Sequence, residues 1–167
     1  MLLLLRHAKS SWDDPDLADQ ERPLAPRGRR AAAALGARIA RRGLVIDRVL
    51  CSTSRRTRET LALLALPPDT PVALEERLYL ASARSLLARL RRLPVRARKV
   101  LVIAHDPGLD HLARLLVADG RPRAMRRLER GFATGALAEL EVPDGSWSEL
   151  APASAFLARF TRPKDIS

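Results

Sequence analysis

Cysteine, aromatic side chains and long apolar runs are all scarce in this sequence of 167 residues. Its single cysteine, Cys51, excludes an internal disulfide and fits a reducing compartment, so we expect a cytoplasmic protein. The longest apolar run, Leu61 to Leu66, is too short to span a membrane, and we expect no membrane partner. Aromatic residues make up 4% of the chain and do not alternate with basic runs, as stacking on single-stranded nucleic acid would favour. We therefore expect no nucleic-acid partner.

Positive charge is abundant by contrast. The formal net charge is +11, and 27 of the 30 basic residues are arginine. A positive field attracts anions, so we expect the net charge to draw phosphorylated or acidic partners to the protein. The chain length and the 47% hydrophobic content predict a single globular domain, residues 1–167. We expect a monomer or a weak dimer.

Apolar runs alternate with helical patterns along most of the chain. Four consecutive leucines, Leu2 to Leu5, predict a strand that is buried on both faces, as in a parallel sheet. Further elements are expected as strands at 45–50, 72–74 and 99–104, and as helices at 26–42, 55–64, 82–93 and up to about 117. The basic stretch 121–130 is interpreted as a loop, and 132–142 with 147–150 as a final hairpin. This order predicts an α/β fold, a three-layer α/β/α sandwich with a mostly parallel central sheet.

Polar side chains follow three of the predicted strands. Arg6 and His7 come at the end of the first strand, and His105 comes directly after 99–104. Arg56 falls in the first turn of the helix that follows the second strand, where backbone N–H groups favour anions. Parallel sheets bind ligands beyond the carboxyl ends of their strands, so we expect an anion site at this edge. Composition alone does not exclude that these residues have no binding role. His7 could belong to a basic strand end that happens to contain a histidine, and Arg56 could be an ordinary surface arginine.

The segments at these strand ends resemble the motifs of a known family. Arg6-His7-Ala8 is similar to the Arg-His-Gly/Ala signature of the histidine phosphatase (phosphoglycerate mutase-like) superfamily. Residues 52–60 resemble its Ser-x-x-x-Arg-Ala-x-x-Thr motif, whose register selects Arg56, and 102–108 resemble its apolar strand that ends in His. The resemblance implies the phosphoglycerate mutase-like fold and a phosphatase activity.

One branch of that superfamily is the most similar. The opening Arg-His-Ala-Lys-Ser-Ser-Trp at 6–12, the Arg-Pro-Leu at 22–24 and the tail at 160–165 resemble the small SixA-type phosphohistidine phosphatases. Motifs in the same order therefore cover nearly the whole chain. The implied substrate is a phosphorylated protein, with phosphohistidine as the first choice, or a small phosphate compound.

The resemblance also implies a role for each residue. His7 would take the phosphoryl group and form a phosphohistidine intermediate, which water then hydrolyses. Arg6 and Arg56 would bind the equatorial phosphate oxygens, and His105 would donate a further hydrogen bond. No metal or other cofactor is expected, because the chain has no Cys/His cluster and the acids at 13, 14 and 16 lack a histidine partner.

The proton donor for the leaving group is the least determined part of the site. Relatives often have Glu where this chain has Leu80, which leaves Glu76 or Glu75 as replacements from the same loop. Asp106 is a second candidate, since a His-Asp pair resembles the acid-phosphatase branch, in which that Asp is the donor. An N-cap for the following helix is the alternative role of Asp106.

Three functions compete at this stage. The first is a metal-independent phosphatase with a histidine nucleophile. The second is a phosphomutase of the same superfamily, which the short chain disfavours because it lacks room for insertions that enclose a sugar phosphate. The third is a non-catalytic module that binds phosphorylated ligands, and the intact set of Arg6, His7, Arg56 and His105 argues against it.

Overall fold

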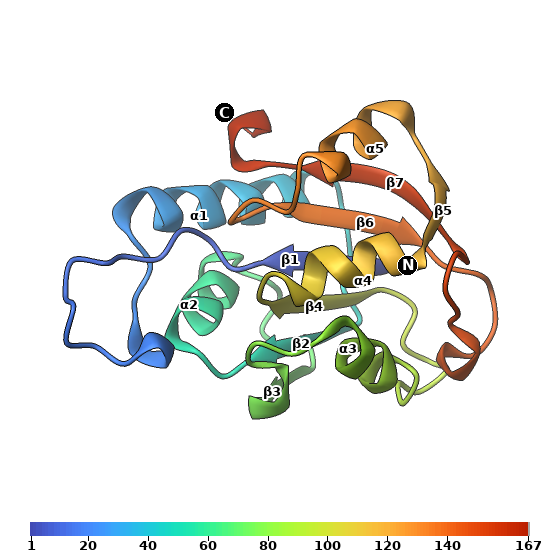
Figure 1. Ribbon diagram of the computed structural model, residues 1–167, viewed down its shortest axis with the longest axis horizontal. Coiled ribbons are helices and arrows are strands. Elements are labelled where there is room, and N and C mark those ends of the chain that lie inside the picture. Colours follow the sequence, from blue (N-terminus) through green and yellow to red (C-terminus); the bar gives the residue numbers. More distant parts are fainter. Residues whose placement is uncertain (167) are drawn as a thin grey trace.

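The computed structural model describes residues 1–166. Its seven strands form one sheet in the order β3-β2-β4-β1-β6-β7-β5 (Figure 1). The strands are β1 (Leu2–Arg6), β2 (Arg48–Ser52), β3 (Val72–Glu75), β4 (Val100–Ala104), β5 (Val117–Gly120), β6 (Leu137–Glu141) and β7 (Ala155–Thr161). The α-helices are α1 (Pro26–Arg41), α2 (Arg55–Leu63), α3 (Ala83–Leu90), α4 (Gly108–Leu116) and α5 (Pro122–Glu129). Short 3-10 helices lie at Asp19–Glu21, Glu76–Leu78, Trp147–Glu149 and Pro163–Asp165.

The sheet is mostly parallel and is covered on both faces, which confirms the predicted fold class. Four strand pairs are parallel, namely β1–β4, β2–β4, β2–β3 and β5–β7, whereas β6 runs antiparallel to β1 and to β7. Helices α3, α4 and α5 pack on one face, and α1 and α2 pack on the other. In the described part of the chain no helix has the length and apolar character needed to cross a bilayer.

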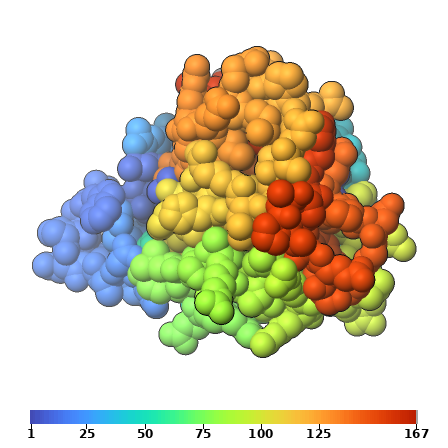
Figure 2. All heavy atoms as spheres, turned by 45° about the vertical axis from the view of Figure 1, so that its right-hand side comes forward, coloured from blue at the N-terminus to red at the C-terminus, as the bar shows by residue number. Residues whose placement is uncertain are grey.

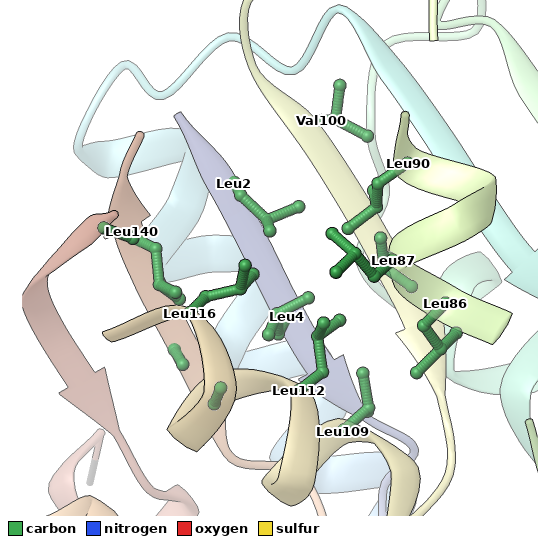
Figure 3. Close-up of a cluster of buried hydrophobic side chains, with 14 of the residues drawn as sticks. Leu2, Leu4, Leu86, Leu87, Leu90, Val100, Leu109, Leu112, Leu116 and Leu140 are labelled. Carbon is green, nitrogen blue, oxygen red and sulfur yellow. The ribbon is translucent and has the colours of Figure 1, made fainter. Parts of the chain in front are cut away.

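Strand β1 is the centre of the packing. Its leucines are fully buried and alternate between two cores, as the period of two along a strand requires. Leu2 and Leu4 face the core that α3 and α4 close (Figure 3), and Leu3 and Leu5 face the core beneath α1. Burying a leucine contributes about 1.5–3 kcal/mol, so this strand is firmly anchored.

The strand register determines which residues meet at one edge. Arg6 of β1 is paired with Ala104 of β4, and Cys51 of β2 is paired with Ile103. The three parallel strands therefore end at the same level. His7, Ser52 and His105, which lie at or just beyond those ends, leave the sheet together.

Most predicted elements begin within one residue of the expected position, but the second strand is displaced toward the C-terminus. It was expected at 45–50 and begins at Arg48 instead. The carboxylate of Asp47 accepts hydrogen bonds from the backbone N–H groups of Arg98, at 2.9 Å, and Lys99, at 2.7 Å. These bonds tie the preceding turn to the start of β4, and Val45 remains 64% exposed.

The interpretation of 121–130 as a loop is wrong, because the segment forms helix α5. Pro122 occupies the first turn, where its missing N–H costs nothing. Ala124 and Leu128 are buried one turn apart and pack against the core at β7. The surrounding arginines obscured this short apolar stripe in the sequence.

The predicted final hairpin is also wrong in its second strand. Strand β6 pairs with β7, at 155–161, and not with 147–150. Trp147 lies in a 3-10 turn instead, since its buried indole donates a 2.6 Å hydrogen bond to the carbonyl of Ala97. The side chain of Ser146 caps that turn by accepting from the N–H of Ser148.

Candidate active site

A pocket of about 400 Å³ opens at the edge where β1, β2 and β4 end. Its wall is formed by Arg6, His7, Lys9, Ser10, Trp12, Asp19, Arg22, Arg56, Leu80, His105, Asp106 and Thr134. Five of the six residues proposed from the sequence are therefore brought together here. The sixth, Glu76, is exposed and does not line the pocket, and its neighbour Glu75 is ion-paired with Arg89 at 2.6 Å.

The imidazole of His7 is fixed by hydrogen bonds around the first turn. Its Nδ1 lies 2.8 Å from the carbonyl oxygen of Ala8, so Nδ1 carries the proton and donates it. Nε2 is then the nitrogen with a free electron pair. The backbone holds this turn in place, because the N–H of Ala8 donates to the hydroxyl of Thr60 at 3.0 Å.

Burial lowers the pKa of His7 from its ordinary value of 6.5 to about 4, with smaller contributions from the positive charges of Arg56 and Arg6. The pKa of His105 is lowered to about 3, again chiefly by burial. A base with a lowered pKa is in its neutral form at any pH above that lowered value. Both rings are therefore neutral and able to share an electron pair near pH 7.

We expect this to be visible in an NMR titration. The ring signals of His7 and His105 should stay unchanged between about pH 5 and 8, the range in which histidines ordinarily titrate. A protonation step of His7 near pH 6.5 would show that burial does not keep the ring neutral.

His105 is held by two polar neighbours. Its Nε2 lies 2.8 Å from the hydroxyl of Ser52, and a guanidinium nitrogen of Arg56 lies 3.4 Å from its Nδ1. Its ring centroid is 5.3 Å from that of His7, and Tyr79 contacts it edge-on at 5.2 Å. The two imidazoles thus lie side by side on the pocket wall.

Arg56 enters the pocket from the first turn of α2. Ser54 caps this helix by accepting from the N–H of Thr57, and Arg56 is only 4% exposed. Its guanidinium donates to the carboxylate of Asp19 at 2.8 Å and to the backbone carbonyl of the same residue. Asp19 also pairs with Arg22 at 3.1 Å and accepts from the hydroxyl of Tyr79. This network orients Arg56.

Arg6 is oriented from the opposite wall. Its guanidinium donates to the carbonyl of Phe132 at 2.7 Å, and the carboxylate of Asp106 lies 3.7 Å away. The N–H of Gly135 binds the carbonyl oxygens of Arg6 and His7. The loop after α5 therefore braces the end of β1.

Asp106 does not cap helix α4. The N-cap position belongs to Pro107, and no side chain accepts a hydrogen bond there. One oxygen of Asp106, Oδ1, is buried and has no hydrogen-bond partner among the described residues. A buried acceptor without a donor is unfavourable, so this oxygen is suited to receive a donor from a ligand or to carry a proton itself.

The pocket has the charge of an anion site. Four cationic side chains line it, Arg6, Lys9, Arg22 and Arg56, against the two carboxylates of Asp19 and Asp106. With both histidines neutral, an excess of two positive charges remains, which complements a phosphate dianion. Within residues 1–166 no three His, Cys, Asp or Glu side chains gather as they would around a metal ion.

Several lining residues were not proposed as site residues from the sequence. Arg22 could have been found, because it belongs to the Arg-Pro-Leu motif, and its guanidinium lies over the Trp12 ring at 3.1 Å from the centroid. Asp19 and Thr134 gave no signal, since Asp19 lies in a short 3-10 helix and Thr134 in a turn, both outside the motifs. Leu80 lines the pocket, so that loop contributes an apolar side chain there and no carboxylate.

Known proteins are similar to this chain in sequence and in fold. A sequence model of the histidine phosphatase superfamily (branch 1) matches residues 2–79, which include Arg6, His7 and Arg56. An uncharacterised protein of Mycobacterium tuberculosis is 36% identical over 162 residues, covering 96% of this chain and all of that protein. The chain belongs to the histidine phosphatase superfamily.

Solved structures extend the similarity to the remaining residues. A protein of Nakamurella multipartitia, assigned as the phosphohistidine phosphatase SixA, is 32% identical with a TM-score of 0.81 over 97% of this chain and 95% of that one. The protein histidine phosphatase SixA complexed with tungstate shares the fold, at 20% identity and a TM-score of 0.78 over 99% of both chains. Membership of this superfamily supports phosphatase activity for the pocket.

Proposed function

We propose that this protein is a metal-independent phosphatase that hydrolyses phosphohistidine in proteins or peptides through a phosphohistidine intermediate on His7. The observation that carries the proposal is the neutral His7 ring, whose Nδ1–H is bound to Ala8, in a pocket with excess positive charge. The likeness to a protein assigned as a phosphohistidine phosphatase supports the choice of substrate.

The reaction would follow two displacements at phosphorus. In the first, the Nε2 electron pair of His7 forms a bond to phosphorus while the bond from phosphorus to the substrate's leaving atom breaks. In the second, a water oxygen bonds to phosphorus and loses a proton to solvent, the electron pair of the P–N bond returns to Nε2, and phosphate leaves. Arg6 and Arg56 neutralise the charge on the equatorial oxygens in both steps, and His105 contributes a hydrogen bond.

The available proton donors favour an imidazole leaving group. The pKa of Asp19 is lowered to about 2, first by the hydrogen bond from Tyr79 and then by Arg56, so this carboxylate is ionised and cannot donate. Asp106 is then the remaining carboxyl group on the wall. An alkoxide needs a donated proton, whereas a phosphohistidine ring that already carries a proton on its other nitrogen leaves as neutral imidazole, a far weaker base. Phosphohistidine therefore suits this pocket better than phosphoserine.

We expect Asp106→Asn to separate the two kinds of substrate. Hydrolysis of phosphoserine peptides and other alkyl phosphates, already slow in the wild type, should fall by about tenfold or more, the lower end of general acid catalysis. Turnover of phosphohistidine peptides should stay nearly unchanged, because their leaving group does not need the acid. The measurement is kcat/KM for both peptides with the same preparations.

Two outcomes would contradict these assignments. Equal losses on both substrates would mean that Asp106 shapes the pocket and does not donate a proton. Wild-type enzyme that hydrolyses phosphoserine faster than phosphohistidine would overturn the proposed substrate. Stoichiometric binding of a phosphohistidine peptide without any release of phosphate would favour a non-catalytic binding module.

Metal independence leads to a separate prediction. Activity should be unchanged after dialysis against excess EDTA, since Arg6, Arg56 and His105 supply the charge stabilisation that a metal ion would otherwise provide. Vanadate and tungstate should inhibit competitively, because both oxyanions resemble phosphate. Activity that EDTA removes and a divalent cation restores would assign the site to a different chemistry.

A further inference from the structure

A second concave surface lies along the outer half of strand β7. It has a volume of about 370 Å³ and is lined by residues of α1, α5 and β7. Figure 1 shows these elements in the upper part of the molecule, and Figure 2 shows α5, in orange, at its top. Strand β5 pairs with β7 only as far as Leu157, so within the described chain β7 is the outer strand from there on. We name this surface the arginine groove; it is lined by Arg38, Arg121, Arg123, Ala124, Arg127, Ala158, Arg159, Phe160, Thr161 and Asp165.

The positive charge of the arginine groove is only partly neutralised. Arg127 pairs with Asp165 at 2.6 Å, and Arg159 lies 3.5 Å from Glu139 of β6. The other three guanidinium groups have no ion-pair partner within residues 1–166; they belong to Arg38, Arg121 and Arg123. Five cations thus surround a single lining carboxylate.

The groove also offers a hydrogen-bond donor that lacks an acceptor. The Nε–H of Arg38 is buried and has no partner among the described residues. The backbone carbonyl of Phe160 on β7 accepts from Arg127 at 2.7 Å, so groove side chains reach the backbone of this strand. A ligand rich in acceptor oxygens would satisfy the free donor of Arg38.

We propose that the arginine groove binds an acidic, extended segment of a partner protein. Carboxylate or phosphate groups would pair with Arg38, Arg121 and Arg123, and an extended backbone would lie along the outer edge of β7. Nucleic acid fits less well, because the one aromatic residue of the groove, Phe160, is only 1% exposed and presents no face on which a base could stack.

The location links the groove to the catalytic pocket. Thr161 is paired with Leu137, and Leu137 is paired with Leu5, so the groove reaches the edge of the sheet at which His7 lies. A bound segment would therefore approach the catalytic pocket from the α5 side. Identifying the partner as the phosphorylated substrate rests on the proposed function, whereas the binding itself does not.

The test is direct binding, measured without turnover. A fluorescently labelled peptide of alternating glutamate and threonine is titrated with the full-length protein in low salt, and its anisotropy is recorded. The double variant Arg121→Glu/Arg123→Glu should raise Kd by about tenfold or more, because it replaces two exposed cations of the groove by anions. Added salt should weaken binding to the wild type.

The matched control is Arg92→Glu/Arg96→Glu, which makes the same change of charge at two exposed arginines outside the groove. This variant should change Kd by no more than about twofold, as expected of charges that are not in contact with the ligand. Equal weakening by both variants, or no binding to the wild type, would overturn the proposal. A single-stranded oligonucleotide that binds more tightly than the peptide, and loses affinity only in the groove variant, would reassign the groove to nucleic acid.

Turnover of an aryl phosphate distinguishes this test from a test of the catalytic function. It should be the same for the groove variant and the wild type, since Arg121 and Arg123 do not line the catalytic pocket. Loss of peptide binding with unchanged aryl phosphatase activity supports the groove. A wild-type protein that binds the peptide but hydrolyses no phosphate would leave the groove supported and the proposed function refuted.

Discussion

His7→Ala should lower kcat/KM for every phosphate substrate by at least about two to three decades, which corresponds to about 3–4 kcal/mol of lost transition-state stabilisation. The variant removes the nitrogen that bonds to phosphorus, while Arg6 and Arg56 continue to bind the phosphate. We therefore expect most of the loss in kcat and a smaller change in KM. Acid-labile phosphate should be trapped on the wild-type protein after rapid quenching, and none should be found on the variant.

Two matched variants make this result specific. His111→Ala removes an exposed imidazole on α4 and should leave activity and phosphate trapping unchanged. His105→Ala removes the neighbouring ring and should slow phosphorylation, but the trapped phosphate should still lie on His7. Full activity of His7→Ala, or acid-labile phosphate on His105 of the wild type, would contradict the assignment of the nucleophile.

The apolar pattern predicted the part of the fold that positions these residues. Continuous apolar runs at 2–5 and 100–104 indicate strands buried on both faces, and such strands run parallel in α/β proteins. Parallel strands of similar length end at one edge, so the meeting of His7 and His105 followed from the runs themselves. In the structure Leu2 is paired with Val100 and Arg6 with Ala104, so the two strands end at the same edge of the sheet.

The sequence could not predict the contacts made by the irregular segments. Asp19 reaches Arg56 and Tyr79, which are 37 and 60 residues away along the chain, and no local pattern encodes those distances. Strand β7 was missed for a different reason. The register between β6 and β7 shifts between Glu139 and Leu140, and this irregularity interrupts the alternation of buried and exposed residues by which a strand is recognised.

The clustered arginines of α2 show the same limit of prediction from the sequence. Composition does not distinguish Arg55, Arg56 and Arg58, and only the resemblance to the family motif selected Arg56. In the structure Arg55 and Arg58 are exposed, whereas Arg56 is buried beside Asp19 and His105. A helix places consecutive residues about 100° apart, so one residue of such a cluster faces the pocket while its neighbours face solvent.

Arg56→Ala should have the second largest effect, a loss of about two decades or more in kcat/KM, or about 3 kcal/mol. In the transition state the charge of the transferred phosphoryl group is spread over its equatorial oxygens, and the buried guanidinium acts on them with little screening by water. Arg56→Lys keeps the charge but not the planar pair of donors, so we expect it to recover only part of the activity. The measurement is kcat and KM for an aryl phosphate with all variants.

Arg58→Ala is the control from the same helix, because it removes an exposed guanidinium of equal charge. It should leave kcat/KM within about twofold of the wild type, as is usual for an exposed charge away from the reacting atoms.

Loss of Arg56 also deprives Asp19 of a partner, although Arg22 and Tyr79 still bind that carboxylate. Thermal unfolding therefore has to be measured alongside the rate. A lowered Tm with an unchanged kcat/KM at a temperature where the variant is folded would mean that Arg56 stabilises the loop and does not bind phosphate. A large fall in kcat/KM with little change in Tm would support its role in catalysis.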